Sequence, residues 1–178
     1  MLKKKDSFDV CFITTSFKDY MTNTISSKEG PIINIETNEV VGKHNGLMYY
    51  TIGQRKGLDL GGNKERTFVV GKDLNDNILY VASGDENNYL YSDSALIENV
   101  NWISDNKPNK CSAKFRYRGQ DNEVSIEFLQ DDNIIVKYPQ LVKSVTPGQA
   151  CVFYNEEECL GGGIIKEVRK NNEKLWYL

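Results

Sequence analysis

The chain has 178 residues, of which 26% are charged and 11% aromatic, and its formal net charge is −3 at pH 7. These values predict a globular protein of one large or two small domains. They exclude a membrane protein, because no apolar run approaches the roughly 20 residues that span a bilayer. The charged N-terminus is unlike a signal peptide, and four cysteines without a C-x-x-C pair exclude a structural zinc site. We therefore expect a cytoplasmic protein with no metal and no membrane partner.

The first half of the sequence predicts one short helix followed by strands. Residues 10–13 have strand character, and residues 15–25 place apolar side chains at helical spacing. Turn-forming residues then separate five predicted strands, which cover residues 31–35, 40–44, 48–52, 67–71 and 78–82. A hairpin turn is predicted at Asn75-Asp76-Asn77.

The second half predicts six more short strands, after a boundary between Ser83 and Asp93. Their regular turn signals indicate an antiparallel barrel or sandwich, and the strands are predicted at residues 95–103, 111–118, 123–129, 134–138, 150–154 and 163–168. Gly161-Gly162-Gly163 lacks the Lys-Ser or Lys-Thr ending of a phosphate loop and predicts a kink or bulge instead.

Basic residues alternate with apolar ones along the predicted strand 111–118. Lys114, Arg116 and Arg118 fall on one face of it, roughly 6.6 Å apart, a spacing that fits the phosphates of an RNA strand. The next strand carries Glu123 and Glu127, so cross-strand ion pairs that neutralise the cations are the alternative.

Residues 44–58, His-Asn-Gly-Leu-Met-Tyr-Tyr-Thr-Ile-Gly-Gln-Arg-Lys-Gly-Leu, resemble the signature of bacterial tRNA-specific 2-thiouridylases, the MnmA or TrmU family. Further similar segments follow in the family's order at residues 70–73, 101–103, 113–118, 146–150 and 159–165. The resemblance covers the central and C-terminal domains of the family and leaves out its N-terminal ATP-pyrophosphatase domain.

The resemblance implies a mainly β fold. It consists of a segment at residues 1–28 with one short helix, a small central β domain at 29–88, and a six-stranded antiparallel β-barrel of translation-factor type at 89–178.

Residues 6–13 resemble the family segment that carries the second catalytic cysteine, which makes Cys11 the predicted catalytic residue. In the family, ATP adenylates the C2 oxygen of the wobble uridine of tRNA. Sulfur carried on this cysteine as a persulfide then replaces that oxygen. The partner cysteine and the Ser-Gly-Gly-x-Asp-Ser loop for ATP have no counterpart in the 178 residues. ATP is therefore expected only at the ATP-pyrophosphatase domain, and the chain alone is expected to bind no cofactor and to be inactive.

The resemblance also implies partners: the anticodon region of tRNA, a sulfur-donor or relay protein, and the ATP-pyrophosphatase domain. We predict tRNA contacts in two places, and the residues are Gly53, Gln54, Arg55 and Lys56 together with Lys114, Arg116 and Arg118. An ordinary basic hairpin tip is the alternative for the first group. His44 is predicted to be a packed residue rather than a base, because no carboxylate or nucleophile lies near it in sequence.

Two wider alternatives stay open. One is a non-catalytic β-barrel module that binds RNA or a protein, and the other is a stand-alone paralogue that works with a separate ATPase chain.

Overall fold

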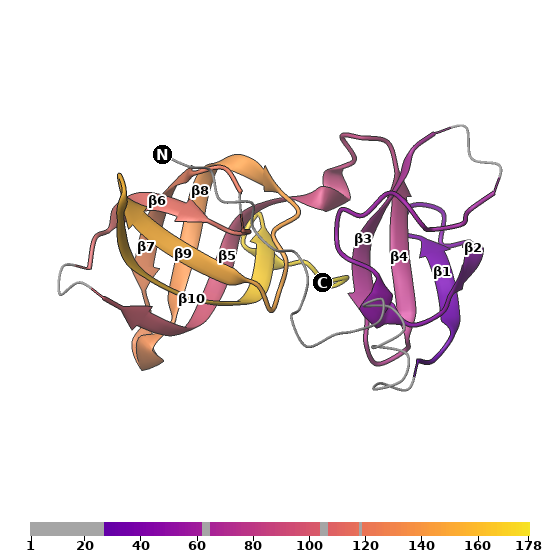
Figure 1. Cartoon of the computed structure of the whole chain (residues 1–178), viewed down its shortest axis with the longest axis horizontal. Coiled ribbons are helices and arrows are strands. Elements are labelled where there is room, and N and C mark those ends of the chain that lie inside the picture. The colour runs from indigo at the N-terminus through magenta and orange to yellow at the C-terminus, as the bar shows by residue number, and fades with distance from the viewer. Residues whose placement is uncertain (1–26, 62–64, 104–106, 118) are drawn as a thin grey trace, which may run out of the picture.

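The computed structural model describes residues 27–61, 65–103, 107–117 and 119–178 as a four-stranded sheet beside a closed barrel (Figure 1). The predicted strand 10–13, the predicted helix 15–25, Cys11 and Arg118 lie outside the described residues. In the described part of the chain, no helix has the length and hydropathy needed to cross a membrane.

The sheet has the strand order β2-β1-β4-β3, with β1 and β4 parallel and the outer pairs antiparallel. Its strands are β1 (Gly30–Asn34), β2 (Val40–His44), β3 (Thr67–Asp73) and β4 (Ile78–Ser83). The predicted turn between β3 and β4 is confirmed. The Asp73 carboxylate accepts hydrogen bonds from the backbone N–H groups of Asn75 and Asp76, and Asn77 takes a φ of 56°, which asparagine tolerates well.

The prediction of a strand at 48–52 is wrong. Leu47–Tyr49 form a single 3-10 turn, η1, and residues 50–57 continue as turns and extended chain. Gly46, at a φ of 135°, turns the chain into η1, and the N–H of Tyr50 is bonded to the Leu47 carbonyl instead of to a neighbouring strand. The local preference of Met, Tyr, Thr and Ile for strands is therefore overridden by the two glycines that bracket the segment.

The six-stranded antiparallel barrel is confirmed. Its ring runs β10-β5-β8-β7-β6-β9 and closes through pairing of β9 with β10. The strands are β5 (Tyr91–Trp102), β6 (Lys110–Lys114), β7 (Asn122–Phe128), β8 (Ile134–Lys143), β9 (Ala150–Asn155) and β10 (Glu158–Lys170), with β11 (Glu173–Lys174) added beside β10. Short 3-10 turns precede β5 (η2, Asn88–Leu90) and β8 (η3, Gln130–Asp132). β6 ends four residues before the predicted end of its strand.

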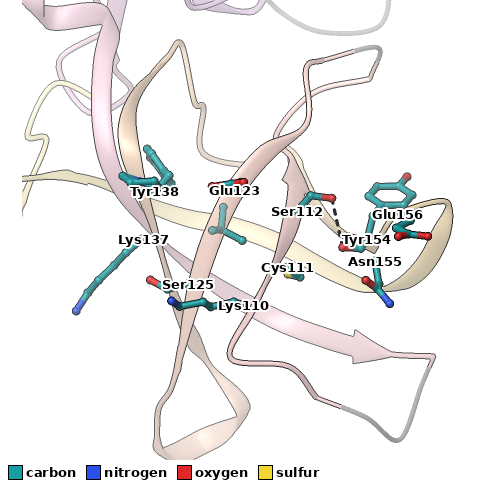
Figure 2. A pocket seen from close by; sticks show the side chains of 12 residues that line it. Lys110, Cys111, Ser112, Glu123, Ser125, Lys137, Tyr138, Tyr154, Asn155 and Glu156 are labelled. Carbon is teal, nitrogen blue, oxygen red and sulfur yellow. Dashed lines mark hydrogen bonds between the residues drawn. The ribbon is translucent and has the colours of Figure 1, made fainter.

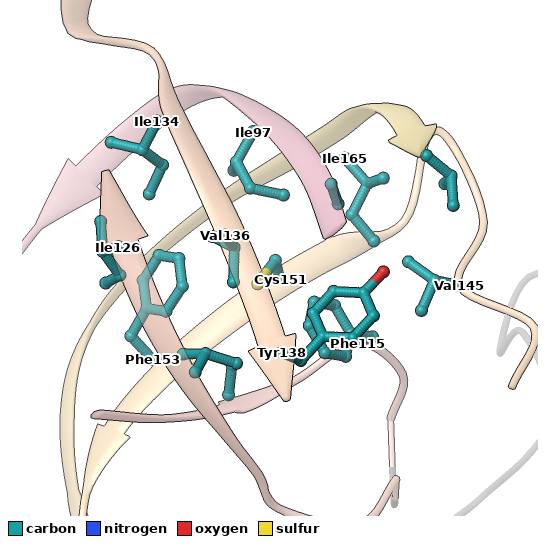
Figure 3. Close-up of a cluster of buried hydrophobic side chains, with 14 of the residues drawn as sticks. Ile97, Phe115, Ile126, Ile134, Val136, Tyr138, Val145, Cys151, Phe153 and Ile165 are labelled. Atoms are coloured by element: carbon teal, nitrogen blue, oxygen red, sulfur yellow. The ribbon is translucent and has the colours of Figure 1, made fainter. Parts of the chain in front are cut away.

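The barrel interior is filled by alternate residues of every strand, as Figure 3 shows for the side chains that converge on Phe153 and Val136. Phe153 is fully buried and stacks on Trp102 with 5.3 Å between ring centroids. Tyr138 meets its need for a hydrogen bond through Ser92, whose hydroxyl oxygen lies 2.7 Å from the tyrosine oxygen. Because these side chains fill the interior, the barrel has a packed core rather than a channel.

The glycine run in β10 forms the predicted bulge. The pairing register with β9 shifts between Cys159 and Gly161, and Gly161 has a φ of 145°. A Cβ at Gly161 would lie 2.3 Å from the Asn101 carbonyl oxygen on β5. Glycine is therefore required here by the close approach of a neighbouring strand.

The chain returns from the barrel to the sheet at its C-terminal tail, residues 175–178. The Lys72 N–H donates to the Tyr177 carbonyl over 2.9 Å, and the Tyr177 hydroxyl donates to the Tyr89 carbonyl over 2.9 Å. Leu175 and Leu178 pack against both hydrophobic cores. The sheet and the barrel thus share apolar side chains across their junction.

Candidate nucleic-acid interface

The loop Gly53–Gly57 has a fixed backbone. Gly53 takes a φ of 85° and its N–H donates to the Val69 carbonyl over 2.8 Å, while the Val69 N–H donates back to Gln54 over 2.9 Å. The side-chain amide of Gln54 is used inside the loop. Its oxygen accepts from the Thr51 N–H and its nitrogen donates to the Lys56 carbonyl, both at 2.9 Å. These bonds tie the loop to β3 and hold the two basic residues at its tip.

Arg55 and Lys56 are exposed at that tip. Neither forms an ion pair or side-chain hydrogen bond with any residue that the structure describes, so both cations are available for an external anion. Two exposed cations on a loop whose backbone is held by hydrogen bonds form an arrangement suited to binding phosphate.

Arg116 lies at the junction between the barrel and the sheet. Its Nη2 donates to the Ile52 carbonyl over 2.9 Å and to the Thr146 hydroxyl over 3.2 Å. Burial lowers the pKa of the Arg116 guanidinium, which is half-buried. This guanidinium therefore holds the start of the loop against the barrel through neutral oxygen atoms.

Gly53 adds a second close contact at the same place. A Cβ at this position would lie 2.7 Å from the Ser144 hydroxyl of the barrel. The Ser144 carbonyl in turn accepts from the Thr146 hydroxyl over 3.0 Å. Loop, guanidinium and barrel turn form one hydrogen-bonded unit.

Lys114 sits in a different environment from Arg116. Its ammonium lies 5.0 Å from the centre of the Tyr154 ring and 3.5 Å from the Asp121 carboxylate. Lys114 is therefore ion-paired, but with Asp121 in the turn before β7 and not with the predicted Glu123 or Glu127. Glu127 pairs instead with Lys137 of β8 at 2.8 Å. Ala113 and Phe115 are both buried in the barrel core, so the alternation continues past the end of β6 at Lys114, yet Lys114 and Arg116 have different partners.

His44 is a packed residue, as predicted. It is fully buried, its Nδ1 accepts from the Gly46 N–H at 3.1 Å, and its Nε2 lies 2.9 Å from the Asn77 carbonyl. Because Nδ1 accepts, the proton is on Nε2, which donates to Asn77. Both ring nitrogens are committed to backbone groups, which leaves none for proton transfer.

A pocket of about 680 Å³ opens on the barrel wall at β6, β7 and β8 (Figure 2). Cys111 lines it, and burial raises the pKa of that thiol, which disfavours a nucleophilic thiolate. Lysines and glutamates both line the rim, at Lys110, Lys137, Glu123 and Glu156. The mixed charge gives this pocket no preference for a polyanion.

Comparisons with known proteins match both β units. Residues 18–83 match the tRNA methyl transferase PRC-barrel domain family, and residues 92–165 match the aminomethyltransferase beta-barrel domain family. The chain is 51% identical to a tRNA-specific 2-thiouridylase MnmA 2 of Geobacillus kaustophilus, over 98% of this chain and 48% of that relative. The MnmA 2-thiouridylases of Geobacillus thermodenitrificans and Bacillus cytotoxicus are 51% and 49% identical over the same shares.

Along nearly its whole length, the chain is similar to tRNA-specific 2-thiouridylases.

The 2-thiouridylase signature at residues 44–58 runs from the end of β2 through η1 to the basic loop. It begins at the buried His44 and ends just past the exposed tip. Some of its residues therefore pack in the protein interior and others lie on the surface. The chain spans about half the length of the 2-thiouridylases that it matches.

The predicted site residues fall into three groups in the structure. Arg55 and Lys56 form the exposed tip, Gly53 and Gln54 shape its backbone, and Arg116 braces it from the barrel. Lys114 lies apart on the barrel wall, and Cys11 and Arg118 lie outside the described residues. Sequence reasoning missed the bracing residues Ser144 and Thr146. Thr146 begins the family-like segment 146–150, whereas Ser144 lies outside every such segment.

Proposed function

We propose that this chain supplies a tRNA-binding surface and the sulfur-carrying Cys11 to a tRNA 2-thiouridylase. The loop tip at Arg55 and Lys56 carries the first part of the proposal, since two exposed, unpaired cations stand on a backbone fixed from both sides. A preformed loop loses little conformational entropy on binding, so its cations contribute more of their interaction energy to affinity.

The chemistry proposed for the complete enzyme is sulfur transfer to C2 of the wobble uridine. Cys11 would carry the sulfur as a persulfide received from a donor or relay protein, and ATP would be bound by the ATP-pyrophosphatase part of the family. A tRNA substrate would place the protein in the cytoplasm. The proposal for Cys11 is supported by the likeness of residues 6–13 to the family segment.

Binding of a wobble-uridine tRNA across a salt series tests the surface. Each phosphate contact contributes a slope of about 0.7 to 0.9 in the logarithm of affinity against the logarithm of salt concentration. We expect Arg55→Ala/Lys56→Ala to lower affinity and to reduce the slope by about 1.4 to 1.8. The matched control is Lys28→Ala/Lys43→Ala, which removes two exposed lysines from the same part of the fold. Equal losses in both double variants would mean that only overall charge matters.

Mass spectrometry tests Cys11 separately. After incubation with a cysteine desulfurase and cysteine, a mass increase of about one sulfur atom is expected on the peptide that contains Cys11 and not on that peptide from Cys11→Ser. A persulfide on Cys111 or Cys159 instead would contradict the assignment. If neither tRNA nor sulfur binds, the chain is a non-catalytic module that recognises another partner.

A further inference from the structure

A second pocket, of about 330 Å³, lies at the junction of sheet and barrel. Four segments of the chain line it. Tyr50, Thr51 and Ile52 come from the chain before the basic loop, Lys72 and Leu74 from the end of β3, Thr146, Pro147 and Gln149 from the turn before β9, and Leu178 from the C-terminal tail. The first three segments belong to or adjoin stretches that the sequence singles out, and folding brings all four to one place.

Lys72 is the only cation among the residues that line this pocket. It is half-buried, and burial lowers the pKa of its ammonium. Its backbone N–H donates to the Tyr177 carbonyl, but its side chain has no ion pair or hydrogen bond with a residue that the structure describes. A partly desolvated ammonium without a partner is unfavourable for folding, so the position favours an anion supplied by a ligand.

The rest of the lining suits a flat organic group next to that anion. Tyr50, Ile52 and Pro147 provide apolar contact, while Thr51 and Gln149 provide hydrogen-bonding groups at the rim. A pocket near 330 Å³ is at the small end of ligand sites, which commonly run from about 300 to 1,000 Å³. It admits a single nucleotide and excludes a duplex.

We propose that the junction pocket binds one unpaired nucleotide of an RNA strand, with its phosphate on the Lys72 ammonium and its base against Tyr50, Ile52 and Pro147. The pocket wall at Ile52 leads directly into the basic loop, so a strand whose phosphates contact Arg55 and Lys56 reaches the pocket without leaving the surface. This deepens the proposed tRNA surface and rests on it for the identity of the strand.

Nitrogen-15 NMR of the 178-residue chain tests the pocket with defined probes. Uridine monophosphate, uridine, inorganic phosphate and a uridine hexanucleotide are titrated separately. We expect uridine monophosphate and the hexanucleotide to shift the backbone amides of Thr51, Lys72 and Gln149, with the hexanucleotide binding more tightly. Mononucleotide binding without hexanucleotide binding would overturn the assignment to an RNA strand, as would shifts confined to residues away from the pocket.

Two variants separate the charge of the pocket from its space. Lys72→Met keeps the apolar stem and is expected to weaken hexanucleotide binding at least tenfold, whereas Lys43→Met, at an exposed lysine of β2, changes it less than twofold. Gln149→Trp places a bulky ring at an exposed rim position and is expected to block the base. Unchanged binding in both pocket variants would overturn the proposal.

The pocket and the tRNA surface can fail separately. If Arg55→Ala/Lys56→Ala weakens tRNA binding but both pocket variants bind the hexanucleotide like the wild type, only the pocket assignment fails. If Arg55→Ala/Lys56→Ala leaves tRNA affinity unchanged while the hexanucleotide still shifts the Lys72 amide, the proposed surface fails and the pocket assignment holds.

Discussion

Two regions of this chain are both rich in basic residues, but their cations have different surroundings in the structure. In the loop Gly53–Gly57, Arg55 and Lys56 are exposed and unpaired within the described residues. On the barrel, Arg116 donates to Ile52 and Thr146, and Lys114 lies over Tyr154 near Asp121. Local charge therefore identifies candidates for phosphate binding, but the reach of a long side chain decides whether its charge is used inside the protein.

The largest expected effect is on stability and comes from Arg116→Ala. A hydrogen bond from a charged group contributes about 1.5 to 3 kcal/mol, and this variant also leaves the carbonyl of the buried Ile52 without its Arg116 donor. We expect a loss of about 2 to 3 kcal/mol in the free energy of unfolding, measured by urea denaturation. Lys114→Ala is the matched change on the barrel wall, and its exposed pair predicts a loss of less than about 1 kcal/mol. Equal losses would break the contrast between an internal brace and a surface cation.

Gly53→Ala comes next, because it combines backbone strain with a close contact. A positive φ costs a non-glycine residue about 1 to 2 kcal/mol, and the new Cβ would meet the Ser144 hydroxyl at 2.7 Å. Thermal unfolding should show a loss of about 2 kcal/mol. Gly57→Ala has the strain at a φ of 74° but no atom closer than 4.0 Å, so about 1 kcal/mol is expected. A loss for Gly57→Ala as large as that for Gly53→Ala would show that contact with the barrel adds nothing.

Tyr177→Phe sharpens the comparison at the other side of the junction. It removes one hydrogen bond, from the hydroxyl to the Tyr89 carbonyl, while the ring stays in place. Burial raises the pKa of this phenol to about 12, so the bond is present throughout the neutral range. We expect a loss of about 1 kcal/mol in denaturant unfolding at pH 7. A tRNA affinity within twofold of the wild type is the accompanying control.

The smallest effect is expected from Lys72→Met, and its sign is opposite. Burial lowers the pKa of Lys72 in the folded chain, so the unfolded chain holds the proton more tightly. Wild-type stability should therefore rise with pH through the alkaline window below the ordinary lysine value of about 10.4. The variant should match or exceed the wild type at pH 7, by less than about 1 kcal/mol, and the difference should shrink as pH rises. A variant less stable than the wild type at pH 7 would mean that the ammonium stabilises the fold.

Much of the fold was predictable because alternation and turns are local properties. Val40–His44 and the turn at residues 75–77 follow from strand-forming residues and from Asn and Asp, which accept positive φ. The bulge at Gly161 was also visible, since three glycines interrupt a strand. Closure of the barrel followed from the family resemblance rather than from periodicity.

The errors and omissions lie where distant residues decide the outcome. The segment 48–52 has strand-forming residues, yet its backbone groups bond within η1 and the loop, and Arg116 occupies the Ile52 carbonyl. Spacing along β6 could not show that Arg116 reaches across the junction. The pocket around Lys72 could not be predicted either, because only folding brings its four lining segments together.

The C-terminal tail gives the molecule a second connection between its two halves, made by hydrogen bonding and packing rather than by the chain itself. The chain leaves the sheet after β4, enters the barrel at β5, and comes back to Gly71 and Lys72 through Tyr177. Two bodies joined at one point can swivel, but two bodies joined at two separate points lose that rotation. A nucleotide bound at the junction would therefore contact a sheet and a barrel that do not rotate against each other. Its entry and release would then depend on movement of side chains or on detachment of the tail.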